Sequence, residues 1–231
     1  MTSPATAAIG LAAHGAAVLA KITLSIPDRI GSPQATRFLG MFTWLTVQTN
    51  VICCYRFALV LVARFVGSDA IIALTVRMFP LSFGLGSMLT MLYYALDFFN
   101  PENVKKRKEF SKHVAPYCEL AAHIEHGTAL PVAVLDACTL AAHNHSRPAV
   151  MLPIGLYILL YMLQTIANHA ATKVWQYPII ADVQRAAGWP GVLVLFAAIA
   201  CLACLTAHLG VAIAGLDEWR PPILTVTANE E

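Results

Sequence analysis

Apolar residues fill six long runs of the chain, and short polar segments separate one run from the next. Each run is long enough for the hydrocarbon core of a bilayer, which a helix of roughly 20 apolar residues spans. Segments rich in proline, glycine, asparagine and charged residues, such as 27–33, 67–69 and 100–108, end these runs. The pattern predicts an all-α polytopic membrane protein in which residues 1–231 form one helical bundle. The predicted transmembrane helices, about six in number, are residues 7–26, 38–66, 70–99, 115–142, 149–172 and 189–216.

The composition supports the same class of protein. Hydrophobic residues make up 58% of the 231 residues and charged residues only 12%, about half of the roughly 25% in a typical soluble domain. Too few polar side chains remain to cover a water-exposed globule, so we expect an integral, multi-pass membrane protein in contact with lipids. The net charge is +2, and the one dense basic run, Lys105 to Lys108, lies between Glu102 and Glu109. We expect no nucleic-acid partner.

The fourth apolar run carries ionisable residues that a membrane-spanning helix seldom tolerates. Each costs roughly 2.5 to 3.5 kcal/mol at the centre of a helix on insertion scales, so each needs a reason. Glu119, His123 and His126 follow the i, i+4, i+7 spacing that places side chains on one helix face. Three further polar groups lie along this run and its neighbours: Asp97, Asp136 and His169. The set predicts a polar cavity lined by several helices, although Glu119 and Asp136 also suit the headgroup zone.

The second apolar run offers hydroxyl groups for the same cavity. Thr43, Thr46 and Asn50 are spaced i, i+3, i+7 and share a helix face. A buried threonine commonly returns its hydroxyl to the backbone carbonyl one turn earlier, so threonine alone indicates no chemistry. As a nucleophile it needs a base within hydrogen-bond reach. His126 or His123 provides that base only if the second and fourth helices are neighbours.

Four groups of residues occur in the same order as in a known family. They are Phe42-Thr43 with Asn50, Tyr94-Ala95-Leu96-Asp97, His123 and His126 with Leu130-Pro131 and Asp136, and His169 with Trp175 and Tyr177-Pro178. On these motifs the sequence resembles the family of the androgen-induced protein and the androgen-dependent regulator of tissue factor pathway inhibitor. The resemblance covers nearly the whole membrane domain. It departs at Thr46, where the family has Asp or Asn, and at Asn50, where the family has Gln.

The resemblance implies a multi-pass membrane hydrolase of fatty acid esters of hydroxy fatty acids. It implies that Thr43 is the nucleophile and His126 the catalytic base, with Thr46 as the reserve nucleophile. The partner is then a lipid substrate with acyl chains, and no cofactor is expected. The candidates for oxyanion stabilisation or for orienting an imidazole are Asn50, His123, Asp97, Asp136 and His169.

Two other functions fit the same residues. One is a metal-dependent intramembrane hydrolase with His123, His126, His169 and a carboxylate as ligands, since imidazole and carboxylate suit zinc. The i, i+3 spacing of the two histidines differs from the i, i+4 pair of helical zinc proteases, so this function ranks second. The other is a lipid-binding or structural subunit of a membrane assembly, which the small residues of the first helix suit.

Overall fold

The computed structural model describes residues 2–24, 40–113, 116–140 and 147–215, and all its regular elements within them are helices. They are α1 (Pro4–Leu24), η3 (Gly40–Thr43), α2 (Leu45–Val66), α3 (Asp69–Leu92), η4 (Tyr93–Phe98), α4 (Pro101–His113), α5 (Cys118–Gly127), α6 (Ala129–Thr139), α7 (Arg147–Thr172) and α8 (Pro178–Gly215). The predicted helix ends at residues 25–26, 38–39, 115, 141–142 and 216 lie outside the described residues.

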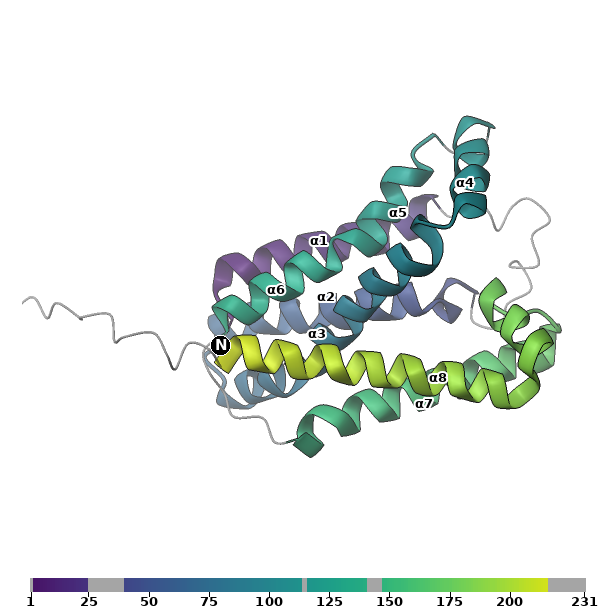
Figure 1. Cartoon of the computed structure of the whole chain (residues 1–231). Coiled ribbons are helices and arrows are strands. Elements are labelled where there is room, and N and C mark those ends of the chain that lie inside the picture. The colour runs from purple at the N-terminus through teal and green to yellow at the C-terminus, as the bar shows by residue number, and fades with distance from the viewer. Residues whose placement is uncertain (1, 25–39, 114–115, 141–146, 216–231) are drawn as a thin grey trace, which may run out of the picture.

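The long helices run side by side in an elongated bundle, and α4 lies across one end of it (Figure 1). Helix α3 occupies the centre, where it packs against α2, α6, α7 and α8. Its small residues permit close approach: a Cβ added to Gly84 would lie 2.6 Å from the carbonyl oxygen of Ala203 on α8. The all-α bundle predicted from the apolar runs is therefore confirmed.

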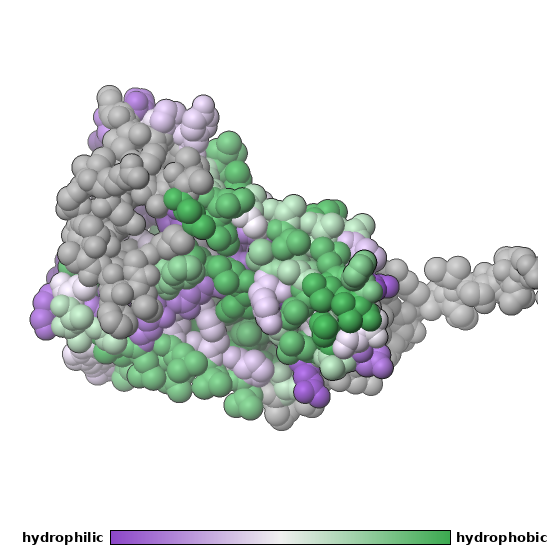
Figure 2. Space-filling view, turned by 180° about the vertical axis from the view of Figure 1, so that it is seen from behind, coloured by the Kyte–Doolittle hydropathy of each residue, from purple (hydrophilic) through white to green (hydrophobic). Residues whose placement is uncertain are grey.

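The outer surface of the bundle is apolar, as a lipid-facing surface requires. Among the described helices, five are long and apolar enough to cross a membrane: Pro4–Ile22, Leu45–Val66, Asp69–Phe98, Ala149–Thr172 and Pro178–Gly215. Large aliphatic side chains point outward, with Leu152 of α7 71% exposed and Val194 of α8 69% exposed. Figure 2 shows hydrophobic residues over broad areas of one face of the molecule. The protein is an integral, multi-pass membrane protein.

The predicted fourth helix is wrong as a single element, because the structure divides it into α5 and α6 at Thr128. Pro131 has no N–H to donate to the carbonyl of Gly127, so the regular ladder cannot continue through this point. The element α8 starts at Pro178, but Gly188 interrupts its helical geometry, so the part of α8 after this residue agrees with the predicted start of the last helix at Trp189. Gly188 has a φ of 64°, a conformation that glycine adopts readily.

A buried ion pair links α2 to α6 toward the end of the bundle where α1 begins and α6 ends. Arg56 of α2 is fully buried and pairs with Asp136 of α6, which also accepts a hydrogen bond of 2.6 Å from Thr2. The guanidinium Nε donates to the Thr75 carbonyl of α3 at 3.0 Å. Asp136 is therefore a structural partner of Arg56.

We expect Asp136→Asn to lower the free energy of unfolding by about 3 to 5 kcal/mol, because it leaves the buried Arg56 charge without its counter-charge. Thermal unfolding in detergent micelles measures this loss. Asp182→Asn is the matched control, since it breaks an ion pair with Arg185 in which both side chains are more than half exposed. Such exposed pairs contribute little. Equal effects of the two substitutions would contradict the structural role of Asp136.

Candidate active site

Polar side chains converge at the end of the bundle where α2 begins, α3 passes into η4 and α5 ends (Figure 1). Thr46 lies in the first turn of α2 and is buried. His126 lies in the last turn of α5 and is half-buried. The second and fourth predicted helices are thus neighbours here, which is the condition that a threonine nucleophile and a histidine base require.

The hydroxyl of Thr46 and the imidazole of His126 are hydrogen-bonded. Thr46 Oγ1 lies 3.1 Å from His126 Nε2, and His126 Nδ1 lies 2.8 Å from the carbonyl oxygen of Ala122. A carbonyl oxygen can only accept, so Nδ1 carries a proton. In the neutral ring, Nε2 then has a free lone pair and accepts the hydrogen bond that Thr46 donates. This tautomer is the one that a base acting on Thr46 needs.

The break between α5 and α6 helps to hold His126. Leu130 donates its N–H to Thr90 Oγ1 at 3.2 Å instead of to the carbonyl four residues earlier, and Thr90 in turn donates to the His126 carbonyl. A hydroxyl from α3 is therefore inserted into the backbone ladder at His126. The Tyr93 ring stacks on the imidazole of His126 with a centroid separation of 4.2 Å. These contacts fix both the backbone and the ring plane of His126.

Element η4 is a π-helix of six residues, a rare wide turn that often occurs at functional sites. It directs the Tyr94 hydroxyl to His123 Nδ1 at 3.0 Å, and the Phe98 ring lies 5.0 Å from the His123 ring. A Cβ at Gly127 would lie 2.8 Å from the Tyr94 hydroxyl, so Gly127 keeps this space open. His123 is thereby held one turn from His126 on the same face of α5.

Asn50 joins the two sides of the site through its amide group. Its Nδ2 donates to the Thr46 carbonyl at 2.9 Å and to the Glu125 carbonyl at 3.0 Å, and its Oδ1 accepts from Nδ1 of His14 at 2.7 Å. Asn50 and His14 are each 1% exposed. Both N–H groups of the amide are used by the protein, so the contacts of Asn50 are those of a clamp between α2 and α5 and not of an oxyanion donor.

Thr43 lies in η3 and is fully buried. Its backbone carbonyl accepts hydrogen bonds from Tyr161 Oη at 3.1 Å and from Gln176 Nε2 at 2.5 Å. The N–H of Leu45, at the start of α2, donates to the hydroxyls of Tyr161 and Tyr177 at 3.1 Å each. The turn that carries Thr43 is therefore fixed against Tyr161 in the middle of α7 and against the segment between α7 and α8.

Three other predicted site residues, His169, Asp97 and Asp136, lie outside the hydrogen-bonded threonine–histidine pair. His169 stacks on Trp175 at 4.0 Å in the corner between α7 and α8. Asp97 is half-buried in η4, and Asp136 belongs to the ion pair with Arg56. Within the part of the chain that the structure describes, no group of three or more His, Cys, Asp and Glu residues is placed to hold a metal ion. Geometry thus gives the metal-dependent function no support.

Several residues of the site carry no sequence signal that separates them from packing residues. Tyr93 and Thr90 are an ordinary aromatic and an ordinary hydroxyl residue within an apolar run, and no motif includes His14. Arg56 differs, because a charged residue inside the second apolar run is itself a signal for a buried partner.

The protein is a polytopic membrane protein with an apolar helical bundle. A polar site, in which Thr46 and His126 are hydrogen-bonded, lies inside one end of this bundle. The family model described as FAR-17a/AIG1-like protein matches residues 11–215, and the chain belongs to this family. The membership predicted from the ordered motifs is confirmed. No curated protein and no solved structure is found to match the chain.

The tautomer of His126 is open to direct measurement. We expect ring-nitrogen NMR of isotope-labelled protein to show a protonated Nδ1 and an unprotonated Nε2 in the neutral ring. Thr46→Val removes the hydroxyl donor and should shift the Nε2 resonance. Thr139→Val is the control, since its hydroxyl contacts Thr6 and α6 carbonyls elsewhere. A protonated Nε2 in the neutral ring would contradict the arrangement.

We expect Asn50→Asp to lower the free energy of unfolding by about 2 kcal/mol or more, because a carboxylate cannot donate to the two carbonyls and is buried. Thermal unfolding measures the loss. Gln184→Glu makes the same amide-to-carboxylate change but keeps the oxygen that accepts from Trp175 Nε1, so it should have little effect. An unchanged stability of Asn50→Asp would rule out the clamp.

Proposed function

We propose that the protein is a membrane-embedded hydrolase of lipid esters in which Thr46 is the nucleophile and His126 the general base. The observation that carries this proposal is the hydrogen bond between Thr46 Oγ1 and His126 Nε2, with Nδ1 engaged by a backbone carbonyl. The family resemblance supplies the substrate class, fatty acid esters of hydroxy fatty acids. The apolar surroundings suit a substrate with two acyl chains.

The reaction has two halves. In the first, His126 Nε2 takes the hydroxyl proton while Thr46 Oγ1 bonds to the ester carbonyl carbon, and the tetrahedral intermediate expels the alkoxide, which receives that proton from His126. In the second, a water molecule gives a proton to His126 and attacks the acyl-threonine. The product is a fatty acid, and Thr46 recovers its hydroxyl proton. The position of Thr46 in the first turn of α2 adds the partial positive charge of a helix N-terminus near the developing oxyanion.

The choice between Thr46 and Thr43 rests on the base. The resemblance implies Thr43, and that role stays a prediction. The hydroxyl of Thr46, one turn further along, is hydrogen-bonded to the nitrogen that must accept the proton. We therefore assign the nucleophile to Thr46 and keep Thr43 as the alternative that the same experiment tests.

The test uses purified protein in detergent with a fluorophosphonate probe, which labels activated hydroxyl nucleophiles, and with a lipid ester as substrate. We expect an adduct at Thr46, mapped by mass spectrometry. Thr46→Val and His126→Gln should each lower both labelling and ester turnover by at least about 10²-fold, since each removes nucleophilic or acid–base catalysis. Thr43→Val is the matched control and should retain both.

The outcomes separate the candidates, provided that thermal unfolding shows each variant to be folded. An adduct at Thr43 that is lost in Thr43→Val would move the nucleophile to Thr43. Folded wild-type protein that neither reacts with the probe nor hydrolyses a lipid ester would remove the hydrolase assignment and favour a lipid-binding role.

A further inference from the structure

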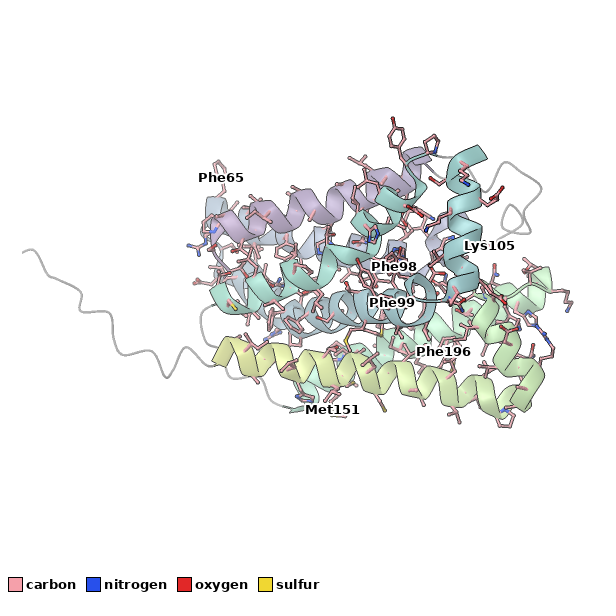
Figure 3. All side chains as sticks on the ribbon, turned by 45° about the horizontal axis from the view of Figure 1, so that its top comes forward. Phe65, Phe98, Phe99, Lys105, Met151 and Phe196 are labelled. Carbon is pink, nitrogen blue, oxygen red and sulfur yellow. The ribbon has the colours of Figure 1, made fainter. Side chains whose placement is uncertain are left out.

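A hollow of about 580 Å³ opens between η4, α4 and α5 beside the candidate active site. One part of its lining is apolar and is made by Phe98, Phe99, Pro101 and Val104. The other part is polar and is made by Lys108, Glu119 and His123. Figure 3 shows Phe98 and Phe99 next to α4, which carries Lys105. An apolar wall that ends in charged groups suits an amphiphile.

The charge on α4 is arranged as a stripe. Lys105, Lys108 and Lys112 follow the i, i+3, i+7 spacing of one helix face, and all three are exposed. Lys105 is four residues from Pro101, which lines the hollow, and Lys108 lines the hollow itself, so these two lysines lie at the opening. Across all its residues, α4 has five lysines and arginines and two glutamates. A negatively charged group is therefore attracted to this wall.

The hollow is connected to the Thr46–His126 pair through aromatic rings. His123 lines the hollow, the Tyr93 ring lies edge-on to His123 at 6.2 Å, and the same ring stacks on His126. Glu119 and His126 are seven residues apart on α5, which corresponds to about 10 Å along the helix axis. This distance is shorter than a lipid acyl chain, so a ligand whose charged end is at Lys108 is long enough to reach the pair.

We propose that this hollow binds the carboxylate end of a lipid acyl chain, with Lys108 as the principal counter-charge and Phe98 and Phe99 in contact with the chain. Glu119 also lines the hollow and offsets part of the positive charge of Lys108, so the net charge of the lining is small and suits a ligand with a single negative charge, such as a carboxylate. The assignment rests on the proposed function in one respect: an ester of a hydroxy fatty acid carries a free carboxylate, which would lie here while the ester reaches Thr46.

The test measures binding, so it does not require turnover. Full-length protein in nanodiscs of zwitterionic lipid is loaded with a fluorescent fatty acid, which is displaced by hexadecanoate or by its uncharged methyl ester. We expect hexadecanoate to displace the probe at a concentration at least about tenfold lower than its methyl ester does. This ratio corresponds to a difference in binding free energy of about 1.4 kcal/mol. Lys108→Gln should remove most of this preference, and Glu119→Gln should increase it. Arg185→Gln removes the same charge from an exposed site outside the hollow and should change nothing.

Each result supports or overturns the assignment. Equal displacement by hexadecanoate and its methyl ester in the wild type would overturn it, as would a preference that Lys108→Gln leaves intact. Displacement of the probe by nanodiscs that contain phosphatidylglycerol, with the same dependence on Lys108, would assign the lysines to bilayer lipid instead. If folded wild-type protein shows no esterase chemistry while the carboxylate preference persists, the proposed function fails and the carboxylate site remains.

Discussion

The backbone polar groups and the charges inside a lipid-exposed bundle need partners within the protein, because the hydrocarbon offers none. The Arg56–Asp136 pair is the strongest case. Its members come from α2 and α6, and the Arg56 guanidinium also donates to the carbonyl of Thr75 on α3. The rings of Phe57 and Phe79 lie 5.3 and 5.2 Å from its central carbon. The compensated charge of Arg56 thus fixes the relative positions of α2, α3 and α6. Because α2 is held in this way, its first turn is held as well.

The same requirement shapes the candidate active site. Where α5 ends, the carbonyl of His126 loses its regular partner, and Thr90 of α3 replaces it. Where α2 begins, the N–H of Leu45 lacks a partner four residues earlier, and the hydroxyls of Tyr161 and Tyr177 replace it. The site thus lies where helices end inside the protein. Such ends need side-chain partners, and those partners position Thr46 and His126.

The sequence predicts most of the helices, but it does not predict which helices pack against one another. Long apolar runs predict helices because hydrophobic length reflects the thickness of the bilayer, a constraint that acts on each run separately. Periodicity also places His123 and His126 on one face of α5. Neither principle states which helix faces which, so the partner of Asp136 and the clamp of Asn50 with His14 depend on packing between segments far apart in the chain. Pro131 removes a backbone donor where α5 and α6 divide. Pro80 does the same inside α3, which stays one helix, so a proline in the sequence does not by itself predict the division.

The departure of this chain at Thr46 bears on the chemistry of the pair. By resemblance, the family has an acid or its amide at this position, and the structure places the position against Nε2 of His126. A carboxylate there would attract a proton to Nε2 and stabilise a charged imidazolium, which cannot act as a base. A threonine hydroxyl donates to Nε2 only when that nitrogen is unprotonated, so it favours the neutral ring. In this chain the residue that faces His126 Nε2 therefore carries a hydroxyl with a transferable proton, which is the reason that the proposal assigns the nucleophile to Thr46 and not to Thr43.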